Sequence, residues 1–155
     1  MRVGIGYDIH PFKEGRPLVL GGVRIPHTHG LDGHSDADVL THAVCDALLG
    51  AMGEGDVGRY YPSSDPACAN MDSLEMLKDV RARLAERGFG LVNLGTVIVA
   101  QAPRLGHVVA AMSQRLAGVL QVEPSLINVT VKSHDRIGAL GREEGIAAQA
   151  VCLIA

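Results

Sequence analysis

The sequence has no tryptophan, and phenylalanine, tyrosine and tryptophan together make up only 3% of its 155 residues. A hydrophobic core must therefore be built from alanine, valine, leucine and isoleucine, whose small side chains let neighbouring elements pack closely. The composition is otherwise globular, 47% hydrophobic and 20% charged, which excludes an intrinsically disordered chain. This length corresponds to one ordinary domain, and we expect a single domain over residues 1–155.

Basic charge and cysteine are also scarce. The formal net charge is −3 and no run of Lys or Arg occurs, so we expect no nucleic-acid partner. The longest apolar run is too short to cross a bilayer, so we expect no membrane partner. The three cysteines, Cys45, Cys68 and Cys152, form no CxxC pair and indicate free thiols in a reducing compartment. We expect a cytoplasmic protein, or a plastid-type location if a transit peptide was removed.

The spacing of apolar residues predicts strands that interleave with helices. Strands are expected at 2–10, 94–100, 126–132 and 145–155, with a hairpin or one bulged strand at 16–26. Helices are expected at 35–50, 73–87 and 106–120, and loops at 26–34 and 57–72. This order predicts an α+β fold, a mixed β-sheet covered on one face by helices.

The first predicted helix, in the segment "HSDADVLTHAVCDALLG", carries polar residues opposite its apolar face. Ser35 is its expected N-cap. Asp38, His42 and Asp46 follow one another at four-residue intervals and therefore share a side of the helix. That side is either a solvated surface or a place where a metal or a phosphate is held.

Asp8 and His10 are two residues apart on a predicted strand, so both side chains leave the same face. With His42 they make one carboxylate and two imidazoles, a set that suits a divalent transition metal, above all Zn²⁺. Three protein ligands leave one position open for a substrate oxygen, and Asp38 or Asp46 can orient His42 from behind. Spacing alone also allows a chance D-x-H pattern and a solvated helical histidine.

Five segments occur in the order and spacing of one known family: "GYDIHPF", "GGVRIP", "HSDADVLTHAVCDALLGAMGEGDVGRYYPSSDP", "AQAPRL" and "GREEGIA". Over essentially the whole chain, the sequence resembles the 2-C-methyl-D-erythritol 2,4-cyclodiphosphate synthases of the non-mevalonate route to isoprenoid precursors. The resemblance implies a metal-dependent phosphorus–oxygen lyase. Its substrate would be 4-diphosphocytidyl-2-C-methyl-D-erythritol 2-phosphate, whose 2-phosphate attacks the β-phosphate to give the 2,4-cyclodiphosphate and CMP.

The same resemblance implies roles for particular residues. Asp8, His10 and His42 match the zinc ligands, and His34 and Ser133 match groups that stabilise the transition state. The positions that match substrate-contacting residues are Asp8, His10, His34, Ser35, Asp56, Val57, Gly58, Tyr61, Pro62, Ser63, Ser64, Asp65, Ala100, Gln101, Ala102, Pro103, Arg104, Leu105, Gly106, Lys132, Ser133, His134, Asp135 and Arg142. Residues 100–106 would line the cytosine pocket and residues 132–135 would bind the cytidine diphosphate. Asp135 would hold a second ion, Mg²⁺ or Mn²⁺, at the substrate diphosphate.

The sequence departs from the family pattern at several of these positions. The segment that typically reads A-T-T-T-E is "VKSHD" here, so Asp135 replaces a longer glutamate and Lys132 adds a positive charge. Ser63 stands where aspartate is usual, so the carboxylate of that family position is missing here. Ala139 replaces a phenylalanine that, with the arginine matching Arg142, lines a central cavity able to hold isoprenoid phosphates. The chain thus lacks the ring of that cavity but keeps Arg142 for an anion.

The resemblance implies a homotrimer whose active sites lie at the subunit interfaces, with a cytidine-diphosphate compound as the small-molecule partner. Two other functions stay open on the residues themselves. A metal-dependent phosphohydrolase would also use an open zinc, but it needs a positioned water and a base for which no residue stands out. A non-catalytic trimeric nucleotide-sensing module would leave the metal residues unexplained.

Overall fold

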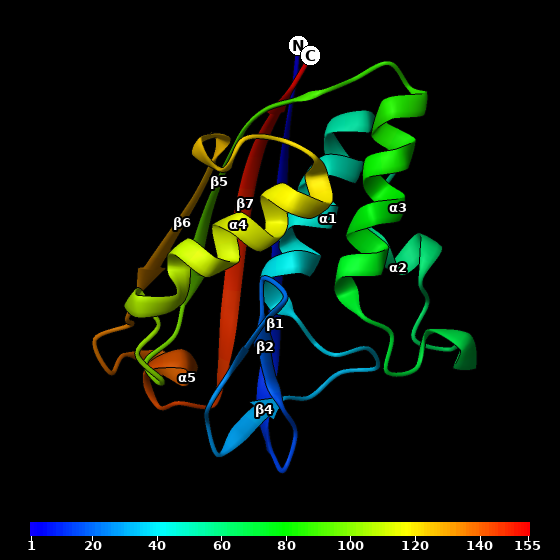
Figure 1. Ribbon diagram of the computed structural model, residues 1–155. Coiled ribbons are helices and arrows are strands. Elements are labelled where there is room, and N and C mark those ends of the chain that lie inside the picture. Colours follow the sequence, from blue (N-terminus) through cyan, green and yellow to red (C-terminus); the bar gives the residue numbers. More distant parts are fainter.

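The computed structural model describes residues 1–155, and strands and helices interleave along it (Figure 1). The strands are β1 (Arg2–Glu14), β2 (Leu18–Leu20), β3 (Val23–Ile25), β4 (His29–Leu31), β5 (Leu91–Val99), β6 (Ile127–Lys132) and β7 (Gly145–Ile154). The helices are α1 (Val39–Met52), α2 (Val57–Tyr60), α3 (Ser73–Glu86), α4 (Val109–Leu120) and α5 (Gly138–Gly141). Short 3₁₀ turns lie at Pro66–Cys68, Gly106–Val108 and Pro124–Leu126.

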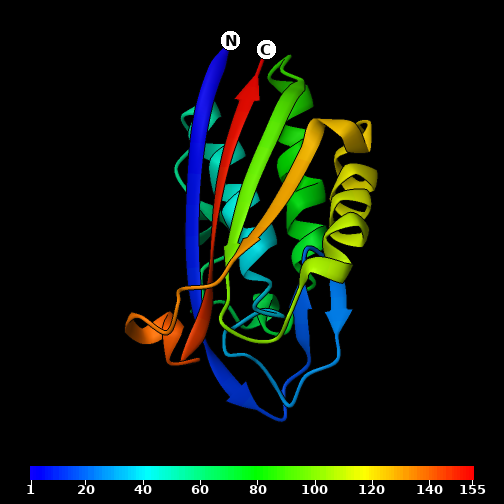
Figure 2. The same ribbon diagram turned by 90° about the vertical axis from the view of Figure 1, so that its left-hand side faces the viewer.

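Five strands form one mixed sheet in the order β4-β1-β7-β5-β6. The pairs are antiparallel except β5 with β6, which run parallel and are joined through α4, as a parallel pair requires a crossover. Figure 2 shows β1, β7, β5 and β6 side by side, with α1, α3 and α4 together behind them and to the right, on one side of the sheet. The α+β prediction of a mixed sheet covered on one face by helices is therefore confirmed.

Glycines allow α1 to lie directly against β1. A Cβ on Gly4 would come within 1.8 Å of the Ala47 carbonyl oxygen, and one on Gly6 within 1.9 Å of the Ala43 carbonyl oxygen. Neither position can carry a side chain while helix and strand keep this spacing. Helix α1 can therefore approach β1 this closely because two positions of the strand have no side chain.

The other face of β1 carries a row of large apolar side chains that no helix covers. Alternation along the strand turns every second residue outward. The outward residues are Val3, Ile5, Tyr7 and Ile9, with exposed fractions of 68%, 63%, 58% and 48%. A contiguous apolar row of this kind is unusual on a free surface and is typical of an interaction face.

Short elements explain most of the differences from the predictions. The 16–26 segment is a hairpin, β2–β3, and the expected loop at 26–34 contains β4. The expected loop at 57–72 contains α2 and one 3₁₀ turn. Three- and four-residue elements are too short to display a period, so hydrophobic spacing cannot reveal them.

The prediction of Ser35 as the N-cap of α1 is wrong. Ala37 has a φ of 57°, a left-handed conformation that keeps the chain out of the helix at that point. Asp38 is the N-cap, and its side chain accepts a hydrogen bond from the Thr41 backbone N–H. The helix therefore begins at Val39, three residues later than a Ser35 N-cap would place it.

The polar side of α1 is not a solvated surface. Asp38 is fully buried, and its carboxylate accepts hydrogen bonds from the backbone N–H groups of Gly21 at 2.8 Å and Gly22 at 2.7 Å. Burial raises the pKa of this carboxyl, although the hydrogen bonds from Thr41 and Gly22 oppose the shift. Asp38 thus ties the β2–β3 turn to the start of α1.

No helix of the structure has the length and apolar character needed to cross a membrane.

Candidate metal centre and active site

Asp8, His10 and His42 come together where β1 meets α1. The Asp8 Oδ2 atom lies 2.9 Å from His10 Nε2 and 2.9 Å from His42 Nδ1, and these two nitrogens are 3.4 Å apart. Around a tetrahedral Zn²⁺ with bonds of about 2.0–2.1 Å, neighbouring ligand atoms are separated by about 3.3 Å. The donor set and its spacing fit a zinc ion with three protein ligands.

Each histidine ring has one nitrogen that faces Asp8 and one, called here the outer nitrogen, that faces away from it. The backbone holds the outer nitrogen of His10. His10 Nδ1 donates a hydrogen bond to the Asp32 carbonyl oxygen at 2.8 Å, and a carbonyl can only accept. The neutral His10 ring therefore carries its hydrogen on Nδ1 and directs the Nε2 lone pair toward Asp8 and His42. This is the tautomer that a metal at Nε2 requires.

The outer nitrogen of His42 lies against two serines. His42 Nε2 is 2.9 Å from Ser73 Oγ and 3.1 Å from Ser35 Oγ. The prediction that Asp38 or Asp46 orients this ring is wrong, because Asp38 is bound to the β2–β3 turn and Asp46 to the backbone of α2. Sequence reasoning missed Ser73, which lies 31 positions from His42 and belongs to no motif.

The charges within the cluster are coupled. Burial disfavours ionisation of Asp8, but hydrogen bonds and attraction from His10 and His42 outweigh it and lower the pKa of Asp8 to about 2. The hydrogen bond to Asp8 raises the pKa of His10 above its ordinary value, against the opposing effect of burial. Asp8 and His10 therefore each favour the charged form of the other.

A cleft of about 220 Å³ opens over the cluster. Its walls include the three cluster residues and, from the predicted substrate-contacting set, His34, Ser35, Val57, Tyr61 and Ser63; Asp46, Cys68 and Met76 complete it. The last two had no predicted role. The structure thus brings the three predicted zinc ligands and five other predicted substrate-contacting residues to one cleft.

Residues 56–65 contribute part of the wall of this cleft. Two hydrogen bonds anchor this segment to the helices beside it. The Asp46 carboxylate accepts from the Val57 backbone N–H at 2.8 Å, and burial raises its pKa despite that bond. The Tyr61 hydroxyl donates to Asp79 on α3 at 2.7 Å, and burial raises the pKa of Tyr61. The expected loop is therefore attached to both α1 and α3.

His34 and the residues after α2 complete the open side of the cleft. His34 Nε2 donates to the Asp65 carbonyl oxygen at 2.8 Å, and Asp56 caps α2 by accepting from the Arg59 backbone N–H. The side chains of His34, Asp56 and Asp65 are exposed to solvent. Of the other predicted contact positions, Gly58 lies in α2 and Pro62 and Ser64 follow that helix in the chain, but none of the three lines the cleft.

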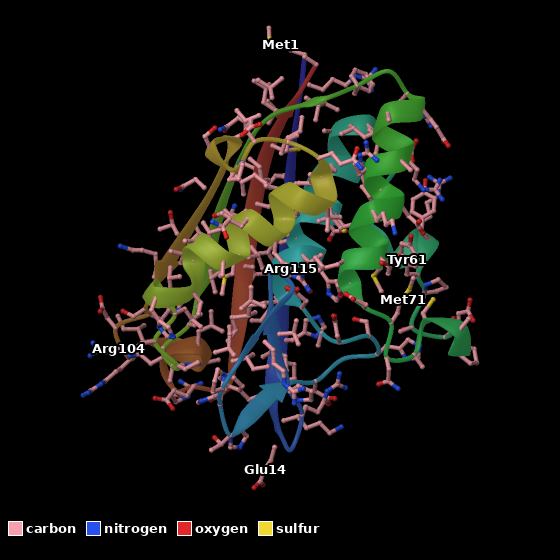
Figure 3. The ribbon with its side chains drawn as sticks, in the orientation of Figure 1. Met1, Glu14, Tyr61, Met71, Arg104 and Arg115 are labelled. Carbon is pink, nitrogen blue, oxygen red and sulfur yellow. The ribbon has the colours of Figure 1, made fainter.

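The second half of the predicted site lies elsewhere in the chain. Residues 100–106 follow β5 and residues 132–135 lie at the end of β6, where the Ala100 backbone N–H donates to the Lys132 carbonyl at 2.9 Å. Arg104 and Tyr61 stand on opposite sides of the molecule (Figure 3). None of these residues lines the cleft over the metal cluster, so one chain alone does not assemble the full predicted set.

Within this second group the side chains contact one another. Ser133 Oγ donates to Asp135 Oδ1 at 3.3 Å, and Gln101 Oε1 accepts from the Arg136 backbone N–H at 3.1 Å. His134 Nδ1 donates to the Ile137 carbonyl at 3.0 Å, which gives it a local structural contact. Arg142 pairs with Glu144 at 2.6 Å at the end of α5.

A model of the YgbB family matches residues 1–155. The chain belongs to the YgbB family. Two curated relatives, from Synechococcus elongatus and Symbiobacterium thermophilum, are each 52% identical, over 153 and 155 residues. The first match covers 99% of this chain and 96% of the relative, and the second covers 100% and 99%. Both relatives are named 2-C-methyl-D-erythritol 2,4-cyclodiphosphate synthase, the family whose resemblance the sequence motifs carry.

A solved structure agrees with this family assignment. A 2C-methyl-D-erythritol-2,4-cyclodiphosphate synthase in a CDP-bound form superposes with a TM-score of 0.91 at 34% identity, covering 99% of this chain and 100% of that one. At that TM-score and coverage, the two chains share the fold over their whole length.

Proposed function

We propose that this chain is a 2-C-methyl-D-erythritol 2,4-cyclodiphosphate synthase. It converts 4-diphosphocytidyl-2-C-methyl-D-erythritol 2-phosphate to the 2,4-cyclodiphosphate and CMP by attack of the 2-phosphate on the β-phosphate. The observation that carries the proposal is the cluster of Asp8, His10 and His42 at an open cleft, with ligand atoms within 4.8 Å of one another. Relatives at 52% identity bear this name, and the CDP-bound neighbour supports a cytidine nucleotide as part of the substrate.

The metal proposed at this cluster is Zn²⁺. When bound, it supplies a Lewis acid that withdraws charge from a phosphate oxygen at its open position. The three residues neutralise and fix that centre, while the Ser35 hydroxyl and the His34 ring border the place where the diphosphate would lie. A second divalent ion, Mg²⁺ or Mn²⁺, is proposed at Asp135 together with the substrate diphosphate.

The chain's own residues have little covalent work to do in this reaction. Two anionic phosphates must be brought into line, and holding reacting groups in line is worth on the order of 7–11 kcal/mol. Asp56 would accept hydrogen bonds from the diol of the substrate, and Ser133 would donate to the phosphates. No side-chain nucleophile is required, which agrees with a cleft whose only cysteine, Cys68, is largely buried.

We also propose that the protein acts as a homotrimer with each active site shared between neighbouring subunits. Two observations support it. The outward row of Val3, Ile5, Tyr7 and Ile9 offers an apolar face to a second copy. The cleft residues and the 100–106 and 132–135 segments lie apart within one chain, so a neighbour's nucleotide segment can complete the cleft.

Phosphorus NMR of the purified protein with the cytidine-diphosphate substrate, Zn²⁺ and Mg²⁺ tests this function. A cyclic diphosphate and CMP are expected, whereas open-chain monophosphates would indicate a phosphohydrolase and unchanged substrate a sensing module. His42→Ala should form no cyclic product. His27→Ala, which removes an exposed histidine outside the cleft, is the matched control and should match the parent.

A further inference from the structure

Ser73 is a fully buried residue at the start of α3 that contacts the segment leading into α1. Its Oγ donates a hydrogen bond to Asp36 Oδ1 and lies 2.9 Å from His42 Nε2. The Asp36 carboxylate also accepts the Ser73 backbone N–H at 3.1 Å. Ser73 is therefore held from two sides, with its oxygen aimed at the outer nitrogen of a predicted metal ligand.

The direction of the hydrogen bonds follows from the chemistry of the groups. An ionised carboxylate can only accept, so the Ser73 hydroxyl hydrogen points to Asp36. The Ser73 oxygen is then left as the acceptor for His42, which must carry its hydrogen on Nε2. In the neutral ring, the form that binds a metal, the His42 lone pair consequently lies on Nδ1, the atom 2.9 Å from Asp8 Oδ2.

We propose that Asp36 and Ser73 form a relay that fixes His42 in the tautomer and orientation needed to bind a metal through Nδ1. The inference rests on the metal-dependent function proposed above. Both are positioning residues, because neither contributes an atom to the Asp8, His10 and His42 cluster. The relay does for His42 what the Asp32 carbonyl does for His10. Hydrogen-bond partners of this kind typically change metal affinity by about 10- to 100-fold.

The relay also determines where the hydroxyl hydrogen of Ser35 can point. Ser35 Oγ accepts from the Ala37 backbone N–H at 3.1 Å and lies 3.1 Å from His42 Nε2. With Nε2 protonated, the Ser35 hydroxyl cannot donate to the ring. Its hydrogen is then free to point into the cleft that Ser35 lines, where an anionic phosphate would accept it.

A purely structural role for Ser73 can be separated from the relay. Asp72, not Ser73, is the N-cap of α3, and its side chain accepts from the Leu74 backbone N–H at 2.8 Å. Alanine is a strong helix former, and Ser73→Ala retains the backbone hydrogen bond to Asp36. The variant should therefore fold with α3 intact while losing only the link to His42.

The test is a titration of the metal-free protein with Zn²⁺ against a competing chelator, without substrate. Ser73→Ala should raise the Kd for Zn²⁺ by about 10- to 100-fold relative to the parent. Thr96→Val is the matched control: it removes an equally buried hydroxyl, which donates to the Asn128 carbonyl at 3.0 Å in the sheet, and should leave the Kd unchanged. Turnover of Ser73→Ala should fall at limiting Zn²⁺ and recover at saturating Zn²⁺ with an unchanged substrate KM.

The outcomes are distinguishable. A parent that binds Zn²⁺ together with a Ser73→Ala variant of equal affinity would overturn the relay and leave the metal proposal standing. A parent that binds no Zn²⁺ would overturn the metal proposal and the relay with it. If Ser73→Ala does not fold, Ser73→Cys, of similar size and with a weakly accepting sulfur, replaces it: weakened binding supports the relay and unchanged binding contradicts it.

Discussion

Asp8 and His42 are 34 positions apart in the chain, and Asp8 Oδ2 lies 2.9 Å from His42 Nδ1. The contact depends on β1 and α1 lying closer together than a strand and a helix with ordinary side chains would allow. Gly4 and Gly6, four and two residues before Asp8, provide this closeness. The metal cluster is thus a consequence of packing in the core as well as of the residues that form it.

Replacing Gly6 tests this dependence. In Gly6→Ala the new Cβ would lie 1.9 Å from the Ala43 carbonyl oxygen, so α1 must move and the free energy of unfolding should fall by about 3 kcal/mol or more. Gly118→Ala on the exposed side of α4 meets no atom within 4 Å and should be neutral or more stable by about 0.5–1 kcal/mol. Denaturant unfolding measures both. A Gly6→Ala variant as stable as the parent would contradict the packing argument.

Asp46 should control substrate affinity through the backbone it holds. Asp46→Ala leaves the Val57 N–H without its partner, a loss of about 1.5–3 kcal/mol for a hydrogen bond to a charged group. The wall carrying Asp56 and Tyr61 is then less ordered, and steady-state kinetics should show KM raised by about tenfold or more, with a smaller change in kcat. Glu75→Gln, an exposed change on α3, is the control. An unaltered KM in Asp46→Ala would show that this bond does not order the wall.

The metal-free protein should show a defined pH dependence of stability. The pKa of Asp8 is lowered from 3.8 to about 2, so its stabilising effect is present above pH 3.8 and is lost as the pH falls toward 2. The pKa of His10 is raised from 6.5, so its effect is complete below pH 6.5 and is lost as the pH rises through the folded-state pKa. The free energy of unfolding, compared with that of metal-free His10→Ala, should therefore differ most between about pH 4 and pH 6.5. A difference that grows above that range would contradict these shifts.

The exposed row on β1 should carry the assembly. Ile5→Glu places a charge in the middle of an apolar face with 63% of the Ile5 side chain exposed, and burying an unpaired charge at an interface is costly. Light scattering should give a trimer for the parent and a monomer for Ile5→Glu, with activity lost in the monomer. Gln114→Glu on α4 should remain a trimer. A fully active monomer would contradict the shared active site.

Long elements could be predicted from the sequence because their periods are visible. The strand at Leu91–Val99 and the helix at Ser73–Glu86 have clear patterns of period two and 3.6, and both were expected within three residues of their bounds. The pairing of Asp8 with His10 also follows from strand geometry alone, because alternate residues share a face. His42 entered the prediction as a polar residue of the first helix, and the family motif strengthened its assignment as the third ligand.

The contacts that the sequence does not reveal are those between residues that only the tertiary fold brings together. Asp38 looks like a residue of a polar face, and only the fold shows that the backbone of Gly21 and Gly22 binds it. Ser73 looks like an ordinary first residue of a helix, and its contact with His42 arises from the packing of α3 beside α1. A polar residue whose partner lies more than a helix length away in the chain has no local pattern to identify it.

The most direct test of this account is a zinc-edge anomalous difference map from crystals grown with Zn²⁺. We predict one peak in each subunit, bonded by Asp8 Oδ2, His10 Nε2 and His42 Nδ1, with a fourth position that no protein side chain fills. The absence of a peak at these three atoms, or a fourth protein ligand that closes the site, would contradict the proposed function of the cluster.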